Sequence, residues 1–504
     1  MLFNSADYII FFITVLVLYY VLPHKLRWIM LLIASIIFYM AWEPALIILI
    51  LFSSFVNYAS ARLIYKNRRN KRFRKGILIL CMVINFGLLT FFKYLMFLSS
   101  LFLEIFGFFG VSLSIGDFNI ILPMGISFYT FQAAAYTIDV YRGELKPVKN
   151  YLRFTLFITF FPQLVAGPIE RAKNLLSQLF KRHSFDIDNI IFGVKFMALG
   201  YFKKVVIADR IAVAVDTIFN SPESFGGISF IAGALLFTVQ IFCDFSGYSD
   251  IAIGTAKTLG INLMTNFDRP YFSRSIKEFW RRWHISLSGW FKDYVYIPLG
   301  GNRVSKPRWA LNIFITFVLS GIWHGANLTF IVWGALHGAF QIIGKIKDSV
   351  IGCFKLKFFV FEGTRKISGR RRRIIPIGII SEIISGVITF CLVAFAWIFF
   401  RANTLGDAFY IVSNLASDLG RITDAQYLYE TVLSWGLGFY PLLLVLGSIG
   451  ILFVIEAVSY KENIVKLMDR LPFIIRFCFY FGLVFIILGI GVFDSGTEFI
   501  YFQF

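Results

Sequence analysis

Histidine, paired cysteine and acidic side chains are scarce in this sequence. Its 504 residues include five histidines and five cysteines, and no two cysteines form a C-x-x-C pair. This spacing indicates neither a disulfide framework nor a zinc site, and we predict no metal. Charged residues make up only 15% of the chain, which excludes an ordinary soluble domain.

Long apolar runs are what the sequence has instead. The chain is 58% hydrophobic, with a mean hydropathy of +0.74. Repeated runs of about 18–25 apolar residues predict an all-α polytopic membrane protein, because a spanning backbone must satisfy its own hydrogen bonds. One helical assembly can use the whole length, so we predict a single domain over residues 1–504, with a core motif region at 266–344 and an outer tail at 494–504.

The net charge of +20 lies in blocks between the apolar runs. Residues 62–75 hold eight Lys and Arg and no acid, and residues 269–308 hold nine against two acids. Such blocks are typical of cytosolic loops under the positive-inside rule, so we expect no nucleic-acid partner. The sign pattern predicts roughly 9–12 spans with both termini outside. The first seven residues lack Lys and Arg, which favours a retained first span over a cleaved signal peptide.

His324 is a histidine embedded in apolar sequence. With a helix beginning near residue 310, it would lie about 21 Å along the helix axis, some two-thirds of a ~30 Å hydrocarbon core. A buried imidazole that stays neutral can accept a proton from a hydroxyl, as a general base for acyl transfer must. Gly321 and Gly325 flank it and suggest room for a thin cavity. The alternative is a histidine bonded to a neighbouring carbonyl as packing.

The basic segment upstream mixes arginines, indoles and a second histidine, His284. Arginine forks bind phosphate and indoles stack on flat rings, so we predict that a nucleotide-bearing acyl donor binds at this cytosolic mouth. The predicted donor contacts are Arg281, Arg282, Trp283 and Arg303. The alternative is anchoring of the tryptophans and arginines to lipid headgroups.

Two further stretches carry polar groups inside apolar flanks. Residues 244–250 hold two acids and several hydroxyls, which is costly in a membrane and marks a functional candidate; the alternative is packing between helices through Ser and Gly. Residues 190–208 hold Lys195, Lys203 and Lys204, which favours an interfacial helix over a span.

Several motifs together resemble the membrane-bound O-acyltransferases, over nearly the whole chain. Within that superfamily the chain resembles the branch of the alginate and peptidoglycan O-acetylation membrane proteins, and the run YVYIPLGGNR is its most specific piece. The matching stretches are residues 161–171, 244–250, 278–301, 294–303, 321–325 and 333–338.

The resemblance implies a multi-helix bundle with a central tunnel in the bacterial cytoplasmic membrane, surrounded by lipid. It implies that acetyl-CoA is the donor substrate, with no permanently bound cofactor. The family's catalytic histidine corresponds to His324 and its upstream histidine to His284. It also implies a separate extracytoplasmic transferase of the SGNH type that passes the acyl group to a polysaccharide such as alginate, cellulose or peptidoglycan.

Residues 499–504 resemble the terminal motif of a small membrane peptide from teichoic-acid D-alanylation systems. That resemblance predicts that Tyr501 takes up the acyl group and hands it to the partner. The alternative is a tail that only seals a helix end. For the whole chain, the two other hypotheses are D-alanyl transfer to teichoic acid, against which residues 298–303 argue, and a transporter or flippase, which predicts ionisable pairs and inverted repeats.

Overall fold

The computed structural model describes residues 1–504 except 110–120, 165–166, 360–376, 460–461, 494–498 and 501–504, and it also leaves out the side chains of 347–359 and 377–379. Throughout the described residues, every regular element is a helix. The all-α prediction is therefore confirmed.

Seven helices in the described part of the chain are long and apolar enough to cross a membrane. They confirm a multi-pass membrane protein. The further spans that make up the predicted 9–12 stay a prediction, because α1 (Ala6–Val21) has 16 residues and α15 (Lys306–His324) is not among the seven. The seven lie at Pro44–Lys66, Lys71–Phe108, Gly227–Thr258, Leu328–Ile346, Ile380–Arg401, Phe439–Val458 and Phe473–Ile490.

The chain divides into two compact units, each built from segments that are discontinuous in sequence. Unit 1 comprises residues 1–217, 239–265 and 421–504, and unit 2 comprises residues 218–238 and 266–420. The helices α11 (Asp209–Asn220) and α12 (Gly227–Thr258) contribute to both. The prediction of a single domain stays a prediction.

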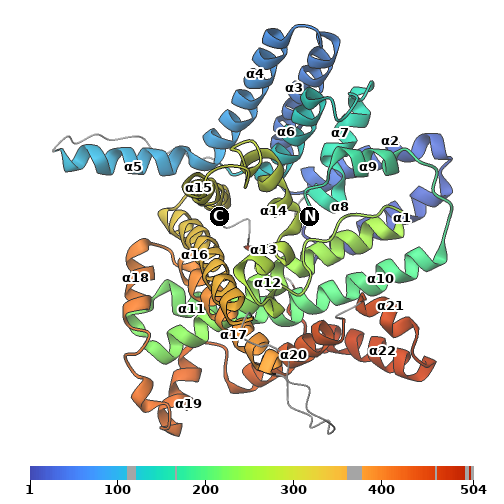
Figure 1. Ribbon diagram of the computed structural model, residues 1–504. Helices are drawn as coiled ribbons and strands as arrows, with labels where there is room; N and C mark the ends of the chain where they lie inside the picture. Colours follow the sequence, from blue (N-terminus) through green and yellow to red (C-terminus); the bar gives the residue numbers. More distant parts are fainter. Residues whose placement is uncertain (110–120, 165–166, 360–376, 460–461, 494–498, 501–504) are drawn as a thin grey trace, which may run out of the picture. The chain divides into compact units, whose positions relative to one another are not determined.

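Unit 1 contains most of the helices drawn in blue, cyan and red in Figure 1. Besides α1 and parts of α11 and α12, they are α2 (His24–Met40), η1 (Pro44–Leu46), α3 (Ile47–Lys66), α4 (Lys71–Leu89), η2 (Thr90–Tyr94), α5 (Leu95–Phe108), α6 (Ile126–Arg142), α7 (Tyr151–Thr159), α8 (Phe161–Leu164), α9 (Ala172–Leu179), α10 (Ile187–Tyr201), η3 (Phe202–Ala208), α19 (Ala425–Ser434), α20 (Phe439–Val458), α21 (Ile464–Asp469) and α22 (Phe473–Ile490).

Small residues bring α10 and α12 into close contact inside unit 1. A Cβ on Gly200 would lie 2.6 Å from the carbonyl oxygen of Gly247, and a Cβ on Gly247 would lie 2.8 Å from that of Gly200. Gly193 and Gly254 repeat the arrangement two turns away. Helix backbones that approach this closely pack through glycine. The packing alternative for residues 244–250 is therefore confirmed for Gly247.

The lysines after α10 do not face a membrane surface. Lys203 is 9% exposed and Lys204 is 1% exposed, and both form ion pairs with acids of unit 1. The interpretation of these two lysines as interfacial charges is wrong, because the π-helix η3 turns them into the unit's core, where carboxylates neutralise them.

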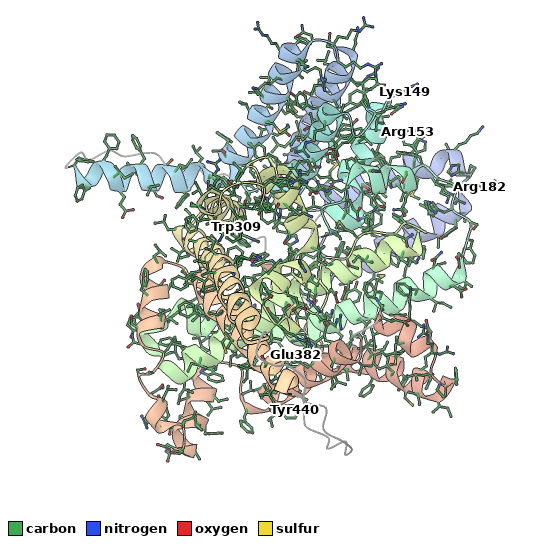
Figure 2. All side chains as sticks on the ribbon, viewed as in Figure 1. Lys149, Arg153, Arg182, Trp309, Glu382 and Tyr440 are labelled. Carbon is green, nitrogen blue, oxygen red and sulfur yellow. The ribbon has the colours of Figure 1, made fainter. Side chains whose placement is uncertain are left out.

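Unit 2 holds the core motif region. Its elements are η4 (Pro222–Ser224), the start of α12, η5 (Pro270–Phe272), α13 (Ile276–Arg282), α14 (Ile285–Phe291), η6 (Lys292–Tyr296), α15, α16 (Leu328–Phe359), α17 (Ile377–Arg401), α18 (Leu405–Ser413) and η7 (Leu419–Arg421). Figure 1 shows α15 beside α16, and these two helices pack against each other closely. Figure 2 labels Glu382 of α17, which pairs with Arg274 just before α13.

Candidate functional site

His324 is the last residue of α15. The helix begins at Lys306, four residues before the predicted start, so His324 lies about 27 Å along it at 1.5 Å per residue. The residue is 2% exposed. Gly325 then leaves the helix in an extended conformation. The structure therefore puts the imidazole at a buried helix end.

Glycines beside His324 serve helix packing. A Cβ on Gly321 would lie less than 3.0 Å from the carbonyl oxygen of Phe330 and 3.4 Å from Cα of Gly334, on the facing helix α16. A Cβ on Gly325 would overlap the Phe330 ring. The prediction of a cavity at these glycines is wrong, because α16 already fills the space. Because α15 and α16 approach each other this closely, α16 fixes the position of the α15 end.

Aromatic rings surround the His324 imidazole. Ring centroids of Trp323 and Trp333 lie 4.9 Å from it, and that of Phe400 lies 5.3 Å away, all three edge-on. Trp333 also stacks on Trp397 of α17 at 5.6 Å. These rings cover the imidazole with apolar surface. A neutral imidazole is the form that can accept a proton.

His284 lies close to the same cluster. Its ring centroid is 6.0 Å from that of Trp323, which in turn contacts His324. The rings of both predicted histidines thus lie beside one indole, that of Trp323. His284 is 0% exposed, and burial lowers its pKa to about 3 from the usual 6.5. His284 is therefore neutral at physiological pH.

The backbone at His284 is left-handed, with φ of 42°. Such a conformation costs a non-glycine residue about 1 kcal/mol or more and persists only where the surroundings impose it. The preceding loop does so: Asn266 Oδ1 accepts from Ser286 Oγ at 2.7 Å, and Asn266 O accepts from the amide of Ile285 at 2.9 Å. Asn266 therefore holds the α13–α14 corner that presents His284.

His337 of α16 has a structural role. Trp280 Nε1 donates to His337 Nδ1 at 3.2 Å, and both residues are buried. Because an indole can only donate, the neutral His337 ring carries its proton on Nε2. Trp333 lies between this ring and His324, with centroids 5.0 Å and 4.9 Å away.

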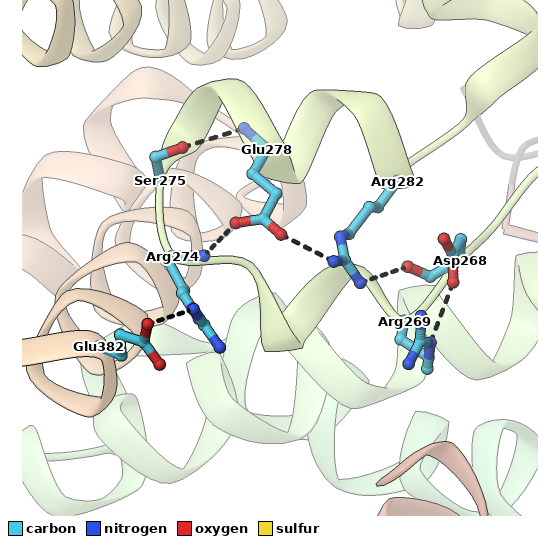
Figure 3. A network of polar contacts seen from close by, with 7 residues as sticks. All are labelled: Asp268, Arg269, Arg274, Ser275, Glu278, Arg282 and Glu382. Carbon is cyan, nitrogen blue, oxygen red and sulfur yellow. Dashed lines mark hydrogen bonds and ion pairs between the residues drawn. The ribbon is translucent and has the colours of Figure 1, made fainter. Parts of the chain in front are cut away.

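Figure 3 shows that Arg282 belongs to a network of polar contacts around α13. Arg282 Nη2 pairs with Glu278 Oε1 at 2.7 Å, and Glu278 Oε2 accepts from the amide of Arg274 at 2.9 Å. Ser275 caps the helix by accepting from the amide of Glu278, and Arg274 Nη1 reaches Glu382 at 2.8 Å. Arg282 Nη1 also donates to the carbonyl oxygen of Asp268 at 3.4 Å. Arg282 therefore holds α13 against the 266–268 loop, rather than being presented to a donor.

Trp283 does not offer a face to a nucleotide. It is 0% exposed, and its ring stacks on Phe279 at 5.4 Å and contacts Trp397 at 5.1 Å. The prediction that it binds the donor is corrected, because neighbouring rings cover it. Headgroup anchoring is wrong for both tryptophans, since Trp280 is 8% exposed and lies inside the same cluster.

A pocket of about 410 Å³ opens beside α13, α14 and α15. Its lining is mostly apolar, and its charged members are the three cations Lys277, Arg281 and Lys292, with no acid among the described lining residues. Ser320 also lines it, one helical turn before His324 on α15. Arg281 therefore lines a cavity, and its contact with the donor stays a prediction. Arg303 is exposed in the loop before α15 and does not line this pocket.

Tyr501 lies outside the described residues. Of the site residues that the structure does describe, His284 and His324 are brought together through Trp323, and Arg281 lies at the pocket. Sequence reasoning missed Trp333, Trp397 and Phe400 as the surroundings of His324. Only the spacing of Trp333 and His337, which puts both on one helix face, signalled part of this cluster.

Comparisons with known proteins give a matching family and several similar sequences. Residues 144–384 match the model of the membrane-bound O-acyltransferase family. The chain is 39% identical over 406 residues to the probable alginate O-acetylase AlgI of Pseudomonas aeruginosa, covering 80% of this chain and 73% of that protein. It is 34% identical to the peptidoglycan O-acetyltransferase of Helicobacter pylori over 76% of this chain and 73% of that one. It is 31% identical to the teichoic acid D-alanyltransferase of Bacillus subtilis over 44% of this chain and 58% of that one.

Proposed function

Because the chain belongs to the membrane-bound O-acyltransferase family, we propose that this acyltransferase moves an acetyl group from cytosolic acetyl-CoA across the bacterial cytoplasmic membrane. The proposed recipient is an extracytoplasmic transferase of the SGNH type, which then O-acetylates an exported or cell-surface polysaccharide. We propose acetyl rather than D-alanyl as the transferred group because of the extent of the sequence similarity. The similarity covers 80% and 76% of the chain for the two O-acetylating relatives and 44% for the D-alanyltransferase.

The pocket of unit 2 supports a thioester donor that bears phosphates. Lys277, Arg281 and Lys292 supply three cations for phosphate groups, while apolar residues of α14 and α15 suit an uncharged thioester arm. Because Ser320 lines the pocket one turn before His324, an arm that enters there extends toward the imidazole.

His324 is the proposed general base. Its neutral imidazole takes the proton of the acceptor hydroxyl as that oxygen attacks the acetyl carbonyl. The carbon–sulfur bond then breaks, the ester remains on the acceptor, and the imidazolium returns the proton to the departing thiolate. The aromatic surroundings favour this chemistry because they exclude water, which would otherwise hydrolyse the thioester. His284, whose ring centroid lies 6.0 Å from that of Trp323, is proposed to help shape the site.

We propose Tyr501 as the hydroxyl that first receives the acetyl group on the outer side. The support is its motif, in which Tyr501 is the one hydroxyl among aromatic residues of 499–504. A phenol ester is a good acyl donor for the next transfer. Mass spectrometry of the peptide that contains Tyr501, taken from an actively turning-over complex, should find it acetylated. Full activity of Tyr501→Phe with no acetylated peptide would exclude the relay.

Radiolabelled acetyl-CoA tests the donor assignment directly. Purified protein should cleave the thioester and transfer label to its partner or to an acceptor hydroxyl, whereas D-alanyl carrier protein should give no transfer. The reverse result would favour D-alanyl transfer, which the similarity to the teichoic acid D-alanyltransferase motivates. The transporter hypothesis is set aside by the family, although unit 1 does contain the buried ion pairs that it predicted.

A further inference from the structure

Buried charges in the core of unit 1 have no part in the chemistry proposed above. Lys204 Nζ lies 2.8 Å from Asp209 Oδ1 and 2.5 Å from Asp244 Oδ1, and all three side chains are at most 4% exposed. Lys203 forms a second set beside them, 2.9 Å from Asp250 and 3.6 Å from Glu456. Charges this deep in a membrane protein are costly and mark a functional role.

Asp244 uses its second carboxylate oxygen to hold a remote part of the chain. Oδ2 accepts from the backbone amide of Ile500 at 2.8 Å, 256 residues further along the sequence. Phe499 is 0% exposed, and its ring centroid lies 4.6 Å from Tyr248 and 5.6 Å from Phe245, both on α12. Residues 499–500 are thus docked by one backbone hydrogen bond and one buried ring.

The chemistry of the cluster suits a docking site. A carboxylate accepts a stronger hydrogen bond from an amide than a neutral group does. Lys204 binds Oδ1 of Asp244 directly and so fixes the orientation of this carboxylate. One carboxylate oxygen therefore binds the lysine while the other points at the Ile500 amide.

Packing between helices does not require Asp244. Gly200 and Gly247, with Gly193 and Gly254, already bring the α10 and α12 backbones together. The Lys203–Asp250 pair links η3 to α12 independently. Neither the glycine packing nor the Lys203–Asp250 pair replaces the hydrogen bond that Asp244 accepts from the Ile500 amide.

We propose that Asp244, oriented by Lys204, is a positioning residue that docks residues 499–500 in unit 1 and thereby fixes the attachment point of Tyr501 during acyl transfer. The docking itself is a property of unit 1. Its consequence for catalysis rests on the proposed function, in which Tyr501 receives the acetyl group. Asp244 acts through the backbone of Ile500 and does not touch the reacting atoms.

Hydrogen–deuterium exchange of the full-length protein in detergent tests the docking without any assay of activity. In Asp244→Leu, which leaves Lys204 paired one-to-one with Asp209, the Ile500 amide should exchange about tenfold to a hundredfold faster than in the wild type, the range that one hydrogen bond to a charged acceptor protects. Asp244→Asn keeps an acceptor oxygen and should show a smaller increase. Asp209→Asn is the matched control, because it removes the other carboxylate of Lys204 and should leave Ile500 exchange within about twofold.

Phe499→Ala provides a second test that leaves the charges intact. It should also speed Ile500 exchange, because the buried ring no longer holds the segment. Equal Ile500 exchange in the wild type, Asp244→Leu and Phe499→Ala would overturn the docking, as would a loss of protection in Asp209→Asn as large as in Asp244→Leu.

An activity assay then distinguishes the docking of residues 499–500 from its effect on acyl transfer. Asp244→Leu should lower kcat for transfer to the acceptor and leave KM for acetyl-CoA unchanged, because the donor pocket is lined by residues of unit 2. Rescue by Asp244→Asn should track the recovered Ile500 protection. Unchanged kcat together with lost protection would overturn the positioning role, and absence of acyl transfer in the wild type would refute only the proposed function.

Discussion

Alanine at Gly321 tests whether close helix packing holds His324 in place. In the wild type the α15 backbone at Gly321 faces the carbonyl of Phe330, and a Cβ there would lie less than 3.0 Å from the carbonyl oxygen, a distance that real Cβ atoms essentially never show. The obstacle is backbone, so it cannot rotate away. Either α15 or α16 must shift, and His324 lies only three residues beyond the substituted position.

The expected magnitude follows from two opposing effects. Overpacking of a tight contact costs about 1–3 kcal/mol, and a clash with backbone belongs at the upper end of that range. Alanine in place of a helical glycine returns roughly 0.5–1 kcal/mol. Gly321→Ala should therefore lower stability by about 2 kcal/mol. Gly344→Ala on α16 is the matched control, since nothing lies within 4 Å of its added Cβ, and it should raise stability by roughly 0.5–1 kcal/mol.

Thermal unfolding in detergent and acyl transfer from radiolabelled acetyl-CoA should be measured on both variants. Gly321→Ala should lose most of its transfer activity along with stability, because His324 moves relative to Trp333. Gly344→Ala should keep full activity. Equal stability and activity in the two variants would refute the argument that α16 fixes the position of His324.

Three further outcomes follow from the described contacts. Arg281→Ala should raise KM for acetyl-CoA about tenfold with little loss of thermal stability, whereas Arg282→Ala should lower stability, because Arg282 is bound to Glu278. Trp280→Phe should cost about 1–3 kcal/mol in thermal unfolding, because it leaves His337 Nδ1 buried without its donor. Stability should fall as pH drops from 6.5 toward 3, by up to about 1.4 kcal/mol per pH unit. The reason is that the unfolded chain protonates His284 in this range, whereas in the folded chain the pKa of His284 is about 3. His284→Gln should lose that part of the pH dependence.

Composition and charge were enough to predict the helical membrane fold. The same patterns identified His284 and His324 as a pair, because histidine is rare in this chain and both lie in motifs of one segment. The structure connects them through Trp323, which immediately precedes His324. That link depends on the contact between the corner at His284 and the end of α15. The periodicity of either helix does not predict such a tertiary contact.

Burial of individual polar and aromatic side chains was the harder part to predict. Trp283 and Lys204 both have the sequence signature of a membrane surface, a tryptophan among arginines and a lysine in a helix with two others. In the structure Trp283 lies among rings from α13 and α17, and Lys204 lies between two carboxylates. Each position depends in part on a partner at least 40 residues away, Trp397 for Trp283 and Asp244 for Lys204, and a single sequence does not reveal those pairings.

The central claim is that His324 is the base of acetyl transfer, and a comparison of two buried histidines tests it most directly. Radiolabelled acetyl-CoA should be given to purified His324→Gln and His337→Gln, both in the same aromatic cluster. We expect His324→Gln to lose transfer by at least about a hundredfold, the range for removing a general base, with thermal stability near that of the wild type. His337→Gln should keep transfer within about tenfold, since its role is to accept the Trp280 hydrogen bond. Transfer retained in His324→Gln, or lost equally in both variants, would contradict the account.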